Sequence, residues 1–227
     1  MHPNMKHHHH HKNEQGQLVE LLQPNQATEL ATWDHPEQRA SVTPNGQMPA
    51  MVGGLAIDSW RGVPTSAAGW EQLAQAAVFH EEPLKPVPGK SSASGAVVVE
   101  ADGRVWVVSP SNGFGGYTNT FPKGKLETKS GLGLRANALK EVFEESGLAV
   151  ELTGFLCDSV RSTSVTRYYL ARRVGGNPAD MGWESQAVHL VPQAQLAAFV
   201  SHPNDQGILK ALTGAMSSLG SGTEQHL

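Results

Sequence analysis

The sequence predicts an α/β protein, and three features of residues 94 to 218 carry that prediction. Two runs rich in β-branched residues, 95–101 and 104–110, flank the turn sequence ADGR and predict a β-hairpin. An amphipathic helix is predicted at 134–146, where Gly147 follows as a stop signal. Further strands and terminal helices come after it, and this order of elements indicates a mixed α/β core.

The first 53 residues have little regular pattern. Five consecutive histidines, His7 to His11, would bind divalent metals in solution, but we interpret them as an expression tag or a low-complexity tail. Residues 17–33 predict a short helix that is interrupted near Pro24. Residues 34–53 are rich in Pro, Asn, Gln and Gly, which is typical of a linker. We therefore place residues 1–53 outside the fold as tag-like, low-complexity and linker sequence.

Residues 54–93 predict an N-terminal extension with a proline-rich end. A turn-like start leads into a short amphipathic helix at about 69–79, and residues 81–93 hold three prolines. This segment could cover a substrate cleft, form a homodimer contact or pack on the sheet. Packing is the default expectation.

Residues 94–218 are expected to form the folded domain, followed by a flexible tail at 219–227. Beyond the hairpin and the helix at 134–146, strands are predicted at 149–158, 163–174 and 183–192, and helices at 193–200 and 203–216.

Composition limits the function classes. The chain of 227 residues suits one domain with extensions, and 39% of its residues are apolar. The net charge of −4 and the pI near 6.2 argue against a broad nucleic-acid-binding surface. The single cysteine, Cys157, excludes an intrachain disulfide and is expected to be a small buried hydrophobe. There is no apolar run long enough to span a membrane and no secretory signal, so we expect a soluble cytoplasmic protein.

The helix at 134–146 carries the residues that suggest chemistry. At 100° per residue, Glu141, Glu144 and Glu145 share one face, and the opposite side is apolar. Hard oxygen ligands at this density suit Mg²⁺ or Mn²⁺. A solvated acidic face is the alternative. The preceding loop favours the metal, because Gly124 allows close backbone approach and Lys123 and Lys125 offer charges for phosphate oxygens.

This stretch resembles the Nudix box, whose pattern is a leading glycine followed by a glutamate and then by R-E-U-x-E-E-x-G-U, with U aliphatic. Gly124 matches the leading glycine, and the second half of the box is matched by Glu141, Val142, Glu144, Glu145, Gly147 and Leu148. The resemblance covers about residues 94–215 and implies a Nudix-type α/β/α sandwich with a mixed sheet, preceded by a partly disordered N-terminal extension. Three departures stand out: Lys140 replaces the arginine, the loop is two residues longer, and the middle glutamate has no clean match.

The resemblance implies roles for the helix and its loop. Glu141 and Glu145 would be the principal metal ligands, and Glu144 would bind a second metal or orient the attacking water. The backbone carbonyl of Lys123 would be a further ligand. Lys140 would orient a helix carboxylate, although lysine lacks the bidentate fork of arginine.

Outside the box, the resemblance implies a general base from a loop before a late strand, and Glu184 is the candidate. The alternative is a turn residue beside a core tryptophan, Trp183, whose ring could also stack on a base. Arg161 and Arg167 flank a predicted strand and are candidate phosphate contacts, and Tyr117 is a candidate for ring stacking. For each of these residues, a role as a surface charge or in packing is the more common alternative.

The implied activity is Mg²⁺- or Mn²⁺-dependent hydrolysis of a phosphoanhydride bond in a nucleoside diphosphate linked to another moiety. The expected partner is therefore a small-molecule nucleotide-type substrate, and dinucleoside polyphosphates and ADP-ribose-like compounds are the competing classes. Capped RNA ranks low because no basic tract suits a long RNA. A Nudix-like binding or regulatory domain that no longer hydrolyses is the main alternative. An isomerase of a prenyl diphosphate is a third, disfavoured because Cys157 lies in no obvious motif.

Overall fold

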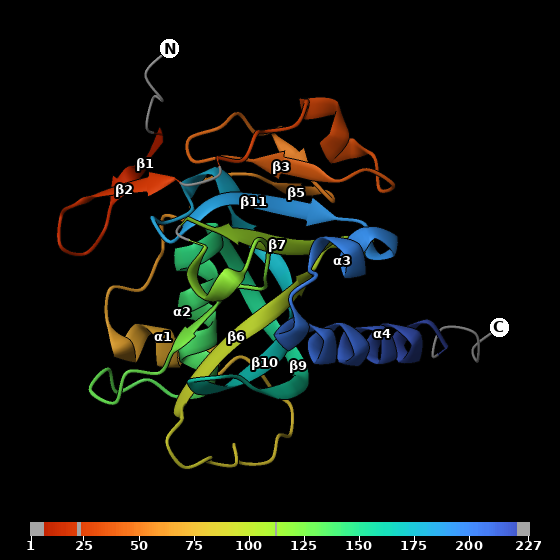
Figure 1. Ribbon diagram of the computed structural model, residues 1–227. Coiled ribbons are helices and arrows are strands. Elements are labelled where there is room, and N and C mark those ends of the chain that lie inside the picture. Colours follow the sequence, from red (N-terminus) through yellow and green to blue (C-terminus); the bar gives the residue numbers. More distant parts are fainter. Residues whose placement is uncertain (1–6, 22–23, 112, 222–227) are drawn as a thin grey trace.

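The protein is described by a computed structural model for residues 7–21, 24–111 and 113–221. Its centre is a seven-stranded sheet (Figure 1). The strand order is β3 (Ala40–Val42), β11 (Ser185–Val191), β7 (Val105–Pro110), β6 (Ser91–Val99), β10 (Ser164–Gly176) and β9 (Leu148–Val160), with β8 (Lys123–Lys125) also paired to β6. Strands β6 and β10 run parallel and the other pairs antiparallel, so the sheet is mixed, as predicted.

Helices cover both faces of this sheet (Figure 1). Helices α1 (Ala67–Ala74) and α2 (Leu134–Ser146) belong to one face, and α3 (Gln193–Phe199) and α4 (Gln206–Ser221) to the other. Successive residues of a strand point to opposite faces, so Tyr168 packs in the core under α3 and α4, and Tyr169 packs in the core under α2. The predicted α/β/α sandwich is confirmed.

The N-terminal region differs from the prediction. The expected linker at 34–53 contains β3, an edge strand of the central sheet, whose Ala40 and Val42 are fully buried. The expected helix at 17–33 is absent, and β2 (Leu18–Leu21) and the 3₁₀ turn η1 (Leu30–Asp34) occupy its place. The histidine run forms β1 (His7–Lys12), which pairs with β2, and β4 (Met51–Val52) pairs with β5 (Leu55–Ala56).

A buried arginine explains why this irregular segment can belong to the core. Arg104, at the start of β7, donates hydrogen bonds to four backbone carbonyls of the segment, those of Thr32, Trp33, His35 and Gln38. Buried carbonyls without partners would destabilise the fold, and the fan-shaped guanidinium satisfies them together. Local sequence pattern cannot reveal such a long-range pairing.

The remaining boundaries are close to those predicted. Helix α1 starts earlier than expected because Ser66 caps it, accepting from the backbone N–H of Gly69. Short 3₁₀ turns lie at η2 (Phe114–Gly116), η3 (Pro178–Asp180) and η4 (Pro203–Asp205). The tail predicted at 219–227 lies outside the described residues after Ser221. Across the described ranges, no helix is both long enough and apolar enough to cross a bilayer.

A chain of buried hydrogen bonds joins β3, β11 and β7. His189 of β11 contacts the hydroxyl of Ser41 through Nδ1 at 2.7 Å and that of Ser109 through Nε2 at 2.8 Å. Ser109 in turn donates to Asn119 Oδ1 at 2.6 Å, so its oxygen accepts from Nε2–H, and in the neutral ring Nδ1 accepts from the hydroxyl of Ser41. Burial, reinforced by the charge of Arg39, lowers the pKa of His189 to about 3.

Because the pKa of His189 is lowered in the fold, the free energy of unfolding depends on pH. Its pKa is about 3 in the fold and 6.5 ordinarily, so below pH 6.5 the unfolded chain binds a proton that the native state does not. The free energy of unfolding therefore falls as the pH drops below 6.5, by about 1.4 kcal/mol per pH unit from this group. We predict that His189→Asn reduces the loss of unfolding free energy between about pH 7.5 and pH 5 by roughly 2 kcal/mol, measured by urea titration. An equal loss in both proteins would contradict the assignment.

Candidate functional site

Helix α2 has the bounds that the sequence predicts, and its end is fixed by glycine. Gly147 adopts φ 68°, and its N–H donates to Phe143 O at 2.7 Å, closing the last turn. A Cβ at Gly147 would lie 2.2 Å from the carbonyl oxygen of Asn177, so only glycine fits between the end of the helix and the turn that follows β10. The helix axis is thereby fixed relative to the sheet.

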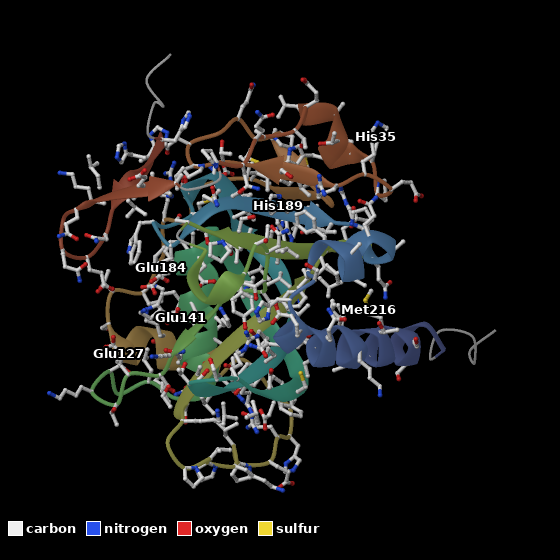
Figure 2. All side chains as sticks on the ribbon, viewed as in Figure 1. His35, Glu127, Glu141, Glu184, His189 and Met216 are labelled. Carbon is white, nitrogen blue, oxygen red and sulfur yellow. The ribbon has the colours of Figure 1, made fainter. Side chains whose placement is uncertain are left out.

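The helix brings two of its acids together with one acid from a distant loop. Oxygens of Glu141, Glu145 and Glu184 lie within 4.8 Å of one another, and Figure 2 shows Glu141 and Glu184 on neighbouring elements. Glu141 and Glu145 are each 8% exposed, whereas Glu184 is exposed. We refer to these three residues as the carboxylate cluster.

The loop that carries Glu184 is attached directly to α2. The backbone N–H of Gly182 donates to the carbonyl of Glu144 at 2.7 Å, and a Cβ at Gly182 would lie 2.5 Å from that same oxygen. On its other side, Ser111 N–H donates to the carbonyl of Glu184 at 2.7 Å. Two backbone hydrogen bonds therefore place Glu184 beside the helix, at the start of β11.

Glu144 lies outside this cluster. It is exposed, and it accepts a hydrogen bond from Lys140 one turn earlier on α2. Lys140 Nζ also lies 3.8 Å from Glu141 Oε1, so it lies between the two glutamates. The structure thus pairs Lys140 mainly with Glu144. Glu127 is exposed on the loop before α2 and does not join the cluster (Figure 2).

Strand β8 approaches the buried carboxylates closely. A Cβ at Gly124 would lie 1.9 Å from Glu141 Oε2, and the N–H of Lys123 donates to Glu145 Oε2 at 3.2 Å. The leading glycine of the motif is therefore required by the position of Glu141. This is a physical reason for glycine that the sequence alone predicts only in general terms.

The cluster carries more negative charge than its surroundings compensate. Burial, and then the charge of Glu145, raise the pKa of Glu141 to about 8, against the opposing charge of Lys140. Burial raises the pKa of Glu145 to about 7, although Lys123 opposes the shift. Burial and Glu144 also raise the pKa of Glu184. Three converging carboxylates with too little cation are a donor set that fits a hard divalent ion such as Mg²⁺ or Mn²⁺.

The cluster opens into a cleft of about 400 Å³. Glu145 and Glu184 form part of its wall, together with Lys123, Gly124 and Lys125 of β8. Lys123 and Lys125 thus line the same cleft as Glu145 and Glu184, and the charge of Lys123 acts on Glu145. Its volume lies in the range of small-molecule sites.

Arg161 lines the same cleft, and its two terminal nitrogens are engaged, whereas its buried Nε has no hydrogen-bond partner among the described residues. It is buried and donates to Tyr117 Oη, to Tyr168 Oη at 2.8 Å and to Asp205 Oδ1 at 2.6 Å. Tyr117 also lines the cleft, and its ring stacks on His202 with 3.8 Å between centroids. Arg161 therefore holds Tyr117 in the wall, and one face of the tyrosine ring is occupied by protein.

Three other candidates lie elsewhere. Arg167 is on the opposite face of β10, where it pairs with Asp158 at 2.8 Å and Glu81 at 3.2 Å, so the prediction that it faces the cleft is wrong. Trp183 is half-buried and is not among the described residues that line the cleft. Cys157 is half-buried against the core under α4, and burial raises the pKa of its thiol to about 11.

Sequence reasoning missed the polar residues that surround the cleft on its far side. Ser162, Thr163 and Ser164, in the turn between β9 and β10, line it together with Asn204. Nothing in the local pattern marks these residues. A hydroxyl-rich turn between two strands beside a charged residue is the only signal that could have indicated them.

The pKa shifts predict how metal binding changes with pH. Glu141 and Glu145 keep protons near neutrality, where the unfolded chain is ionised, so the metal-free fold loses stability as the pH rises from 4.5 towards 8. A divalent cation binds the ionised forms. We predict that Mg²⁺ raises the melting temperature more near pH 8 than near pH 6, measured by scanning calorimetry. A larger rise near pH 6 would contradict this charge assignment.

Gly124→Ala tests the close approach of β8. The added methyl group would displace only the end of the Glu141 side chain, so we expect a change in melting temperature below about 2 °C. The metal, however, would lose a ligand, and we expect the Mg²⁺ concentration for half-maximal stabilisation to rise at least about 10-fold. Gly154→Ala is the matched control, since nothing lies within 4 Å of its Cβ position. Unchanged Mg²⁺ binding in Gly124→Ala would remove Glu141 from the site.

Comparison with known proteins shows a family match for most of the region that carries the site. The family profile for the NUDIX domain matches residues 89–212, over half of the chain. Similar solved structures include a NUDIX hydrolase from Nitrosomonas europaea, at 15% identity and TM-score 0.47, covering 56% of this chain and 90% of that one. An ADP-ribose pyrophosphatase from Streptococcus suis aligns at 19% identity and TM-score 0.42, covering 53% of this chain and 90% of its own. An Ap4A hydrolase from C. elegans aligns at 14% identity and TM-score 0.46, covering 56% and 98%. No curated protein matches the chain in sequence.

Proposed function

This chain belongs to the Nudix family, and from that premise we propose that it hydrolyses a phosphoanhydride bond in a nucleoside diphosphate linked to another moiety. The carboxylate cluster at the mouth of a lysine-bearing cleft is the observation that carries this proposal. Acids suited to a divalent metal and lysines suited to phosphate oxygens line one cavity, which supports phosphoanhydride hydrolysis.

The acids of α2 would hold the metal. Glu141 and Glu145, buried and close together, are the proposed principal ligands, and the backbone carbonyl of Lys123 completes the set. When bound, Mg²⁺ or Mn²⁺ would neutralise pyrophosphate oxygens and lower the pKa of a water molecule. Lys140 holds Glu144 and lies against Glu141, so its proposed role is to orient the carboxylates of this face.

Glu184 is the proposed general base. Its side chain reaches solvent, yet neighbouring protein partly desolvates the carboxylate, and this effect, followed by the charge of Glu144, raises its pKa. A carboxylate with a raised pKa is suited to accept a proton from the attacking water. Lys123 and Lys125 would bind phosphate oxygens as point charges. The terminal nitrogens of Arg161 already serve Tyr117, Tyr168 and Asp205, so its proposed contact with phosphate would use Nε, which has no partner among the described residues.

The substrate class follows from charge and space. Lys123 and Lys125 flank Gly124 on one short strand, which favours a substrate with more than one phosphate group within reach of the cluster. A dinucleoside polyphosphate or an ADP-ribose-like compound has that arrangement. The cleft of about 400 Å³ suits a ligand of nucleotide size.

Glu145→Gln tests the proposal directly. Wild type and variant would be screened with Mg²⁺ and Mn²⁺ against ADP-ribose, dinucleoside polyphosphates, nucleotide sugars and nucleoside triphosphates. An amide is a poor ligand for Mg²⁺, so we expect kcat to fall at least about 100-fold, beyond the 10–100-fold typical of residues one shell further out. Glu151→Gln, on the exposed pair with Arg172, is the matched control and should retain activity.

Two results would overturn parts of this account. Near-normal turnover by Glu145→Gln would refute the metal assignment. Binding of one nucleotide without turnover by the wild type would instead favour a Nudix-like sensor domain, the alternative that Lys140 and the longer loop suggest.

A further inference from the structure

Residues 60–82, which include α1, lie against helix α2 and precede the residues that the family profile matches (Figure 1). We call this segment the clamp. It contacts the first turn of α2 through two polar contacts and the last turns through aromatic packing.

The first contact caps the start of α2. The N-cap residue is Gly133, which has no side chain to bond the free N–H groups of the first turn. In a capping box, a glutamate at the third helical position accepts from the N-cap N–H, but that position here is Ala136. Glu71 of α1 accepts this hydrogen bond instead. A carboxylate from another helix therefore does the work of the missing acid and complements the positive end of the helix dipole.

The second contact pairs the charge of Arg135, which lies at the unfavourable end of the helix dipole. Arg135 lies in the first turn of α2, where a cation opposes the helix dipole. The clamp binds its guanidinium through Glu81 Oε1 at 2.7 Å, Ala77 O at 2.8 Å and Phe79 O at 2.9 Å, and the ring of Phe79 lies 4.1 Å from the guanidinium carbon. Glu81 also accepts from Arg167 of β10 at 3.2 Å, so the clamp ties the helix to the sheet.

The third contact holds the last turns of α2. The ring of Trp60 meets Phe143 edge-on, with 5.2 Å between centroids, and Trp70 lies 6.3 Å from the same ring. Phe143 directly precedes Glu144 and lies two positions after Glu141, on the side of the helix away from the carboxylates. The clamp therefore packs against the turn of α2 that carries Glu141, Glu144 and Glu145.

We propose that the clamp positions α2 so that Glu141 and Glu145 stay beside Glu184, with Glu71 and Trp60 as positioning residues. Contacts on the far side of the helix oppose any movement of α2 away from the Glu184 loop, and they act together with the hydrogen bond from Gly182 N–H to the carbonyl of Glu144. Small displacements matter, since about 1 Å of misplacement can reduce a rate about 100-fold. This inference rests on the proposed function for its catalytic readout, but not for its metal-binding readout.

Glu71→Ala is the test, with Glu71→Gln as the conservative variant and Glu82→Ala as the matched control. Glutamine keeps an oxygen that accepts from Gly133. The side chain of Glu82 is exposed, and within the described part of the chain its only ion pair is with His80. The readouts are the rise in melting temperature on adding Mn²⁺, and kcat and KM for any substrate found.

We expect Glu71→Ala to halve the Mn²⁺-induced rise in melting temperature or reduce it further, and to lower kcat about 10-fold with KM changed less than about 3-fold. Glu71→Gln should recover most of both effects, and Glu82→Ala should match the wild type. A lower melting temperature of metal-free Glu71→Ala, with an unchanged Mn²⁺-induced rise and unchanged kcat, would overturn the proposal, because the clamp would then only pack.

Trp60→Leu covers the case in which Glu71→Ala does not fold. Leucine keeps apolar contact but loses the edge-on ring contact with Phe143. We therefore expect a smaller Mn²⁺-induced rise in melting temperature and a lower kcat, as for Glu71→Ala. Normal Mn²⁺ binding together with normal kcat would overturn the proposal. If the wild type binds Mn²⁺ but hydrolyses nothing, the proposed function fails while the Mn²⁺ readout still tests the clamp. If the wild type hydrolyses a substrate and neither variant changes kcat or Mn²⁺ binding, the clamp fails alone.

Discussion

The burial of several carboxylates beside one another is the constraint on which the rest of this structure depends. Burial favours the neutral form of Glu141 and Glu145, and each adds to the difficulty of ionising its neighbours. Such an arrangement weakens the metal-free fold, so it persists only where the surrounding structure holds it in place. When ionised together, these side chains form a donor set that fits a divalent cation.

The surroundings hold the acids from three directions. Gly124 lets β8 reach the Glu141 carboxylate, Gly182 lets the Glu184 loop hydrogen-bond to the backbone of α2, and Gly147 ends the helix against the following turn. Each glycine is required by a close approach that a Cβ would prevent. The clamp supports the helix from the remaining side. The catalytic face is thus a product of contacts from segments distant in sequence.

The sequence predicted the elements whose signals are local. The bounds of α2 follow from amphipathic spacing and from Gly147, and Glu184 was a candidate before its place beside Glu141 was known. The role of residues before 90 was missed because their contacts are long-range: Arg104 binds four carbonyls of an irregular segment, and Glu71 caps a helix 62 residues away. Arg167 lies away from the cleft because side chains alternate along a strand. It shares a face of β10 with Tyr169, which also contacts Glu81.

The central claim is that Glu141 and Glu145 hold the metal and that Glu184 faces it as the general base, with Glu144 outside this group. Anomalous diffraction from crystals soaked in Mn²⁺ tests this most directly. The account predicts an anomalous peak bounded by oxygens of Glu141 and Glu145 on α2 and facing Glu184, while Glu144 remains paired with Lys140. An anomalous peak on the solvent side of α2, bound by Glu144 and not by Glu145, would contradict it.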